Sequence, residues 1–262
     1  MNTIQIEGEE IAIKNLDSSI ELLFIEKSEA ISVNTIHLCI KEDTSLCISY
    51  IGKEKSKLAI SIDVLEGVHF RLKETREGKK SKIKYTYSLK KNSETTIYKA
   101  YHVEKMKEFD TISLEEEGAS VFYHLETLAI DEEEYEIIVY HNAPKTICNL
   151  SNKAVSIEEG EVSFQVTNVV EQGQKGCTIH QDSRIITLND KKQVVKPILL
   201  IDENDVDASH SAHIGSFDED VLFYLQSRGI QRKEAIKLLL TGFLLGEEGN
   251  KKMKNWIDMY WR

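Results

Sequence analysis

The fold is decided where the chain changes character, in the stretch Asp202-Glu-Asn-Asp-Val-Asp-Ala-Ser-His-Ser-Ala-His-Ile-Gly-Ser-Phe-Asp-Glu-Asp-Val-Leu-Phe-Tyr-Leu-Gln-Ser-Arg-Gly-Ile230. Before it, apolar and polar residues alternate in the period of a β-strand, and after it apolar residues recur at helical spacing. Two histidines, His210 and His213, lie at the junction among several carboxylates. We therefore expect a strand-rich body over residues 1–215 and a helical region over residues 216–262.

Short strands with turn signals between them account for the body. Leu58, Ile60 and Ile62 typify the alternation, while glycines beside charged residues, as at Gly52, indicate turns. The basic run 71–84 is interpreted as a solvated hairpin turn. Roughly eighteen candidate strands and no credible long helix precede residue 216. This pattern suits a sandwich, a barrel or a β-solenoid, and periodicity alone does not choose between them.

Composition excludes several classes of protein. The chain has 262 residues, a formal net charge of −11 and 41% hydrophobic residues, so it can bury a substantial core. Its acidity disfavours nucleic acid as a partner, because phosphate binding relies on cationic side chains. No signal peptide and no apolar run long enough to span a bilayer are found. The four cysteines show no CxxC spacing and are expected to be reduced thiols, which predicts a soluble cytoplasmic protein.

The helical region carries its own start and stop signals. Ser216 and Glu219 have the spacing of a capping box, and Gly229 suits the left-handed position that ends a helix. A second helix is predicted over about residues 231–245, with apolar residues on two faces. A third, short helix should present Met253, Trp256, Ile257, Tyr260 and Trp261. These residues exceed what so small a region can bury alone, so it must pack on the body, on a partner, or on both.

The common catalytic templates do not occur. The chain has no phosphate loop, no GxGxxG, no GxSxG and no HExxH, which argues against the common hydrolases and nucleotide enzymes. We therefore expect no catalytic residues and no nucleotide bound by this chain itself.

One interpretation of the histidine and cysteine residues near the junction is a metal site. His210 and His213 stand near Asp205, and imidazole with carboxylate is reasonable ligation for iron or zinc. The simpler reading is a hydrogen-bonded pair in a loop that caps the β body. Cys177 and His180 would lie on opposite faces of a strand, which disfavours joint ligation of one metal.

Several segments resemble the SufB/SufD family, whose members are scaffold subunits of an iron–sulfur cluster assembly machine. The resemblance covers roughly residues 136–245. It is densest at 169–176, at 183–190, at Lys196-Pro197, at Asp205-Val-Asp-Ala-Ser-His210, at Gly215 and at 222–230. It implies a right-handed parallel β-helix body, best supported over residues 136–205, followed by a small α-helical region that docks a SufC-like ABC-type ATPase.

The resemblance also implies a pair of scaffold subunits, as a homodimer or with a SufB/SufD paralogue, and a transient iron–sulfur cluster near their interface. His210 aligns with the family's histidine ligand. The cysteine expected from SufB should fall near Asp182, where none is present, and Cys177 is the nearest. Ser211 replaces the glutamate that follows the histidine in SufB. Both departures make the site more similar to SufD, or indicate that a short homodimeric system uses other ligands. We expect His210 to be a metal or cluster ligand, with Cys177 as the weaker candidate.

We therefore expect a non-enzymatic scaffold. The alternatives are a structural adaptor that holds the ATPase but no cluster, and a β-solenoid carbohydrate-active enzyme with carboxylates on successive rungs. In the helical region, Leu238 and Leu239 are expected to face the body. The ATPase-binding residues are expected to be Leu222, Phe223, Tyr224, Leu240 and Leu244.

Overall fold

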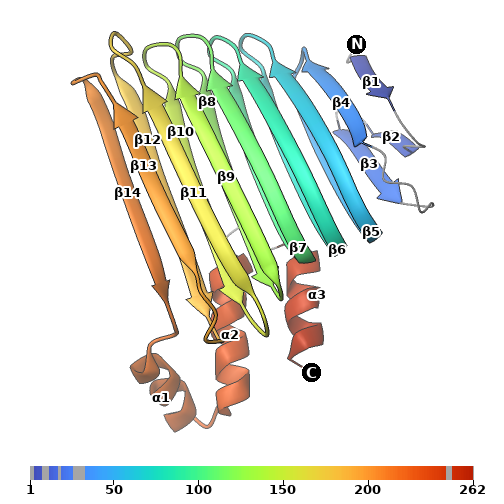
Figure 1. Ribbon diagram of the computed structural model, residues 1–262, viewed down its shortest axis with the longest axis vertical. Helices are drawn as coiled ribbons and strands as arrows, with labels where there is room; N and C mark the ends of the chain where they lie inside the picture. Colours follow the sequence, from blue (N-terminus) through green and yellow to red (C-terminus); the bar gives the residue numbers. More distant parts are fainter. Residues whose placement is uncertain (1–2, 8–11, 17–18, 26–32, 246–249, 262) are drawn as a thin grey trace.

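The chain forms a parallel β-helix followed by three short helices (Figure 1). The computed structural model describes residues 3–7, 12–16, 19–25, 33–245 and 250–261, and their side chains over 36–50, 57–245 and 250–261. Over these residues the β-helix has about six turns. The fold expected from the family resemblance is confirmed, and the sandwich and the barrel are excluded.

Fourteen strands are described, and most pair with a strand one turn away in the chain. Short strands open and close the body, and the longest lie between them. They are β1 (Thr3–Glu7), β2 (Ala12–Leu16), β3 (Ser19–Ile25), β4 (Val33–Ile40), β5 (Thr44–Val64), β6 (His69–Leu89), β7 (Glu94–Leu114), β8 (Ser120–Ala129), β9 (Glu132–His141), β10 (Ile147–Ser156), β11 (Glu161–Val170), β12 (Cys177–Thr187), β13 (Val194–Ile201) and β14 (Val206–Gly215).

Each turn contributes one segment to each of two layers. The first sheet contains β3, the first halves of β5, β6 and β7, and then β8, β10, β12 and β14. The second sheet contains β4, the second halves of β5, β6 and β7, and then β9, β11 and β13. Val33 lies opposite Lys57 and Ile147 opposite Thr178, so one turn takes 24 to 31 residues.

The core lies between the two sheets. Because successive side chains of a strand point to opposite faces, every second residue points inward. Leu72, Ile83, Ile112 and Val139 are among the inward side chains that are fully buried in one continuous apolar cluster. The period-two alternation of the sequence is therefore the alternation between this interior and the outer surface.

The turns predicted at Gly52 and within residues 71–84 are wrong, because long strands run through both positions. At Gly52 the register shifts, and Gly78 has φ of 142°, yet β5, β6 and β7 continue from the first sheet into the second. Lys79 to Lys84 consequently lie within β6 and do not form the predicted hairpin turn. In a solenoid the chain has only to bend at the corner, because its pairing partner lies a whole turn away.

Three helices follow the last strand: α1 (Glu219–Ser227), α2 (Arg232–Leu245) and α3 (Lys251–Tyr260). Asp218 is the N-cap of α1, where its side chain accepts from the Asp220 amide, so the predicted cap at Ser216 is wrong. Gly229, with φ of 88°, stands just beyond the C-cap and donates to the Gln226 carbonyl, as predicted.

Helices α2 and α3 pack on the outer side of the first sheet, near one end of its strands (Figure 1). Ala100, Leu128 and Val155 point outward from the sheet and are buried against Leu244 and Trp256. This contact explains why the helical region carries so many apolar and aromatic residues. In the part of the chain that is described, no helix has the length and apolar character needed to cross a membrane.

The two ends of the β-helix differ. At one end, β1 and β2 run antiparallel to their partners β4 and β3, and each has five residues. At the other end, the ten-residue strand β14 pairs with β12 alone among the described strands, and β13 pairs with β11 alone. The second end therefore presents open strand edges.

Candidate functional site

His210 lies on the last strand of the first sheet, and not in a capping loop. It pairs in register with Gln181 of β12, whose side chain is buried and points into the interior. His210 therefore takes an inward position, yet it is exposed, because β14 has no further strand beyond it among those that the structure describes. An imidazole held at the mouth of the β-helix can bind a metal ion or cluster brought to this end.

His213 takes the opposite side of β14. It pairs in register with Arg184, which points outward, so the two histidines of the junction do not face one another. The imidazole of His213 lies close to Gly215, where an added Cβ would come within 3.0 Å of its Nε2 atom. A joint site built from His210 and His213 is thus excluded by the strand geometry.

The two positions that depart from SufB lie opposite one another. Asp182 on β12 pairs in register with Ser211 on β14, and the Ser211 hydroxyl donates to the Asp182 carboxylate. Arg184 also donates to Asp182, over 3.0 Å. These side chains form a hydrogen-bonded group on the outer side of the sheet, away from the inward side that His210 occupies.

Cys177 lies at the start of β12 and is 1% exposed. Its sulfur lies 3.2 Å from the Thr146 hydroxyl, which lies 2.7 Å from Nδ1 of His141. Nε2 of His141 lies 3.2 Å from the Asn168 side-chain oxygen. Burial lowers the pKa of His141 to about 4, so the imidazole is neutral at pH 7. A thiol, a hydroxyl, an imidazole and an amide are thus linked inside the chain.

Cys177 and His210 are not brought together within one chain. Cys177 pairs in register with Val206, four residues from His210 along β14, which corresponds to roughly 13 Å of strand. His180 is exposed whereas Cys177 is buried, as expected for residues three apart on a strand. Among the residues that the structure describes, no three His, Cys, Asp or Glu side chains gather as a metal site.

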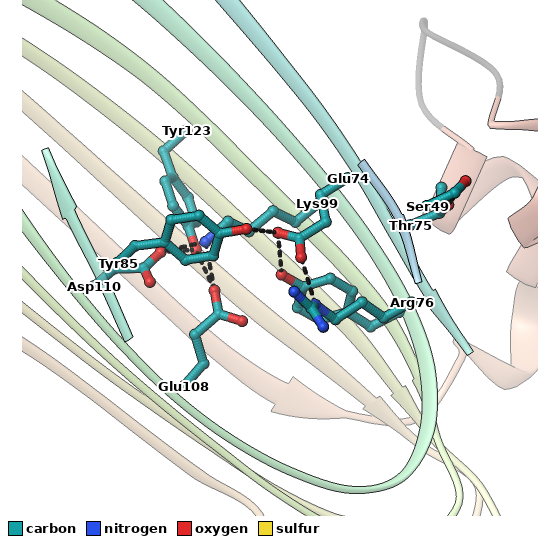
Figure 2. A network of polar contacts seen from close by, with 10 residues as sticks. Ser49, Glu74, Thr75, Arg76, Tyr85, Lys99, Glu108, Asp110 and Tyr123 are labelled. Atoms are coloured by element: carbon teal, nitrogen blue, oxygen red, sulfur yellow. Dashed lines mark hydrogen bonds and ion pairs between the residues drawn. The ribbon is translucent and has the colours of Figure 1, made fainter. Parts of the chain in front are cut away.

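A second group of polar residues fills the interior of the middle turns, and the sequence analysis did not identify it. Glu74 is its first centre, and Figure 2 shows the side chains that converge on it. Nε of Arg76 donates to one carboxylate oxygen of Glu74. The hydroxyls of Tyr85 and Tyr101 donate to the other over 2.7 and 2.9 Å.

Lys99 is the second centre of this buried network. Its ammonium group donates to Glu108 and to Asp110 over 2.5 Å each, and Tyr123 donates to Asp110 over 2.7 Å (Figure 2). The lysine comes from the first sheet and the two carboxylates come from the second, so the network ties the two sheets together across the core.

Electrostatics sets the charge of this network. Burial, with Asp110 close by, raises the pKa of Glu108 to about 8, so this carboxyl stays protonated at neutral pH. Burial opposes ionisation of Glu74 too, but the charges of Arg76 and Lys99 prevail and lower its pKa. The cations of Arg76 and Lys99 therefore stabilise the ionised form of Glu74, while Glu108 holds its proton in the same closed interior.

Within the described part of the chain, several buried side-chain polar atoms have no hydrogen-bond partner. Both terminal nitrogens of Arg76 are among them, although this side chain is fully buried. So are single side-chain oxygens of Glu108, Asp110 and Gln181. Groups of this kind require water or another polar ligand, because an unsatisfied buried polar atom costs about 1–3 kcal/mol.

The signal for the network was present in the sequence. Glu74 and Arg76, and likewise Glu108 and Asp110, stand two residues apart within strand-like segments. The neighbouring inward positions of the same strands, such as Leu72 and Ile112, hold buried apolar residues. Charged residues in phase with the apolar face predict a polar core, whereas residues out of phase with it are solvated.

The buried and exposed side chains of the helices are not the ones that the sequence predicts. Leu240 and Leu244 are completely buried, packed with α3 and the first sheet, so they are not free to meet a partner. Leu222 is also buried, at 2% exposure. Phe223 and Tyr224 are exposed, as expected for contact residues, and Leu238, which was assigned to the body, is 54% exposed. The exposed apolar side chains of α1 and α2 are therefore Val221, Phe223, Tyr224 and Leu238, while α3 exposes Met259 and Tyr260.

These features define a parallel β-helix protein with a helical appendage, a charged interior and an open end that presents a histidine. The family model described as "SUF system FeS cluster assembly, SufBD core domain" matches residues 75–243, which is more than half of the chain. The chain belongs to this family of iron–sulfur cluster assembly proteins.

Individual relatives match shorter segments. The chain is 45% identical over 82 residues to the iron–sulfur cluster assembly protein SufD of Bacillus subtilis, which covers 31% of this chain. It is 30% identical over 106 residues to a SufBD family protein of Mycobacterium bovis, and 28% over 107 residues to one of Staphylococcus saprophyticus, each covering 40% of this chain. The matched segments are 19%, 12% and 23% of these three relatives, so the chain spans only a small part of their length.

Proposed function

We propose that this chain is a scaffold subunit on which an iron–sulfur cluster is assembled, together with a second scaffold subunit and a SufC-like ATPase. The observation that carries the proposal is His210, an inward-facing imidazole left uncovered on the last strand of a SufBD-type β-helix. Cluster and ATP chemistry are brought by the assembly, and this chain contributes a rigid surface and ligands. Its four free cysteines suit the proposed location in the cytoplasm.

The open end of the β-helix is the proposed subunit interface. Edge strands with free backbone groups readily pair with another chain, and β14 offers ten residues of such an edge. Apolar side chains accompany it, because Leu200 on β13 and Ile214 on β14 are 56% and 44% exposed. A homodimer and a heterodimer with a SufB/SufD paralogue both satisfy this geometry.

Cluster ligands then come from both subunits. His210 is the ligand we assign to this chain, since imidazole is a suitable ligand for iron. Cys177 is the weaker candidate, because it is buried and its sulfur is engaged by Thr146 and by the Gln174 carbonyl. To serve as a ligand it would have to leave these contacts when the subunits pair.

The proposed ATPase-docking surface lies on the helices. It consists of Val221, Phe223 and Tyr224 on α1 and Leu238 on the adjacent helix α2, all exposed. Aromatic side chains on a short helix are typical anchors of protein interfaces. This surface replaces the expected one, since Leu222, Leu240 and Leu244 serve the interior of the chain.

Anaerobic reconstitution with iron and sulfide tests the scaffold function, with the ATPase and any paralogue present. The wild-type assembly should develop cluster absorbance, and His210→Ala should lose most of its iron and sulfide while folding normally. His213→Ala is the matched control, because this imidazole faces the other side of β14. Absence of a cluster in the wild-type assembly would make the chain an adaptor for the ATPase. An unchanged iron content in His210→Ala would remove this residue from the ligands.

Co-purification with the ATPase tests the docking surface separately. The double substitution of Phe223 and Tyr224 by Asp should abolish capture of the ATPase and leave the β body folded. Met259→Asp is the control, because Met259 is 55% exposed on a different helix. Equal capture by the double variant and the control would place docking elsewhere on the chain.

A further inference from the structure

A cluster of lysines lies on the outer side of the second sheet and has no part in the function proposed above. Lys80, Lys82 and Lys84 alternate with the buried residues Ser81 and Ile83 on β6, so they point outward. Lys57 on β5 pairs in register with Lys82 and is exposed as well. We call Lys57, Lys80, Lys82 and Lys84 the lysine patch.

The register of the strands brings like charges together here. Lys57, Lys82 and Lys107 stand directly opposite one another on three successive strands, as do Lys80 and Lys105 on two. Like charges directly opposite in a sheet are destabilising. Their concentration is notable in a chain whose formal net charge is −11. Stability of the fold does not account for this arrangement, which points to a role in binding.

Among the side chains that the structure describes, acidic residues neutralise one border of this arrangement. Glu134 on β9 forms an ion pair with Lys107, and Asp131 and Glu132 lie 3.4 and 3.7 Å from Lys105. None of the four lysines of the patch has an acidic partner within the described part of the chain. Their charges are therefore available to a partner.

An aromatic ring lies beside the patch. Phe109 on β7 pairs in register with Lys84, and the ammonium groups of Lys82 and Lys107 lie 5.9 and 5.4 Å from its ring centre. The ring points outward and is half-buried. An aromatic side chain surrounded by cations is a typical anchor point of an interface.

This face is also sterically accessible. The helices pack on the first sheet, through residues such as Ala100 and Val155, and they leave the outer side of the second sheet free over the described residues. The patch measures about 13 Å along β6, from Lys80 to Lys84. Across β5, β6 and β7, from Lys57 to Lys107, the cationic surface measures about 10 Å.

We propose that the lysine patch docks an acidic, extended segment of a partner protein. Side chains of an extended chain that point to one face recur about every 6.6–6.8 Å, which is the spacing of Lys80, Lys82 and Lys84 along β6. Carboxylates at every second position of the segment therefore meet one lysine each, and Phe109 packs against its apolar part.

The borders of the patch favour a short protein segment over a membrane or a nucleic acid. Glu132, Glu134 and Glu136 follow on the next strand of the same face, so the cationic surface ends after three strands. A bilayer or a duplex has a larger contact area and would meet these carboxylates and the negative field of the whole chain. A segment of a few residues fits within the cationic area.

A fluorescently labelled peptide of alternating glutamate and serine, eight residues long, is the probe. We expect it to bind at low ionic strength, as followed by anisotropy, and to dissociate as salt is added. The triple variant K80E/K82E/K84E should weaken binding by about tenfold or more, and Phe109→Ala should weaken it by a smaller factor. The neutral variant K80Q/K82Q/K84Q should also lose binding, with no reversed charge to disturb the fold.

The control variant is K175E/K192E/K254E, which makes the same change of net charge at dispersed, exposed lysines. It should bind the peptide as the wild type does, within about twofold, because distant surface charges are screened by salt. Equal losses in the patch variant and the control would overturn the proposal. It would also be overturned if the peptide failed to bind, or if the patch bound anionic vesicles or duplex DNA more tightly than the peptide.

Discussion

Lys99 and His210 occupy comparable places in two regions of the molecule, with opposite consequences. Both are inward positions of the first sheet, one in a middle turn and one on the last strand. Lys99 is 1% exposed and meets two carboxylates across the core, whereas His210 is exposed. An inward polar side chain therefore supports the structure where another turn covers its strand. The same strand geometry leaves such a side chain available for binding where no described turn covers it.

The largest effect should come from breaking the closed region. Lys99→Met leaves Glu108 and Asp110 buried without their cation, and removal of one partner from a buried ion pair costs about 3–5 kcal/mol. Urea unfolding should show this loss as a lower midpoint. The triple variant K99M/E108Q/D110N, in which neither acidic side chain can ionise, should recover part of it. A single variant as stable as the wild type would show that the network contributes little.

A smaller effect should appear as a pH dependence of stability. The folded pKa of Glu108, about 8, exceeds the unfolded value of 4.5, so the native state holds a proton that the unfolded chain has lost between these values. Stability therefore falls as pH rises through this window. His141, with its pKa lowered to about 4, acts with the opposite sign below pH 6.5. Above pH 6.5 the carboxyls, including Glu133 with a pKa raised to about 7 by burial, prevail.

Unfolding free energies measured between pH 6.5 and 8 cover the window in which these carboxyls lose their protons. They should decline by on the order of 1 kcal/mol per pH unit in the wild type. Glu108→Gln should flatten the decline, because it removes the group that loses its proton. Equal slopes in the two proteins would contradict the role assigned to Glu108.

A local effect should follow in the helical region. Asp218→Ala removes the N-cap of α1 and should cost about 1 kcal/mol of local helix stability. Ser216→Ala should cost nothing comparable, because this residue does not cap the helix. Amide exchange of the first turn of α1 reports on both variants. A larger effect at Ser216 would restore the capping box that the sequence indicated.

The smallest effect on stability is expected at the open end. His210→Ala should change the free energy of unfolding by no more than about 0.5 kcal/mol, because the side chain is exposed and no other turn packs on it. The contrast with Lys99→Met is then a direct measure of the difference between the two regions. A large destabilisation by His210→Ala would indicate that this imidazole supports the fold.

The strands could be predicted from the sequence, but the corners at which a strand passes from the first sheet into the second could not. Alternation of apolar residues placed most strands, because inward and outward positions differ strongly in burial. It did not reveal that β5 runs through Gly52 and β6 through Gly78, because a glycine can indicate either a hairpin turn or a bend within a strand. Which of the two occurs depends on a pairing partner 25 residues away.

The site was predictable in part. Resemblance to the family singled out His210, and only the register showed that His213 faces the other side. On α2, two apolar faces were evident, but the sequence did not indicate that α3 would cover Leu240 and Leu244. The buried network was not predicted, because a charged residue by itself indicates a solvated position. Only its phase relative to the apolar residues of the strand indicates that it points inward.

The unlike ends of the β-helix limit how copies can associate. Short antiparallel strands, β1 and β2, border one end, while the other offers the full length of β14. Short edges template little further pairing, whereas a long one can accept another strand. Among the described strands, two copies joined through β14 would present the five-residue edges of β1 and β2 at their outer ends. Such short edges give a further copy little to pair with, which would oppose the growth along the sheet that builds a fibre.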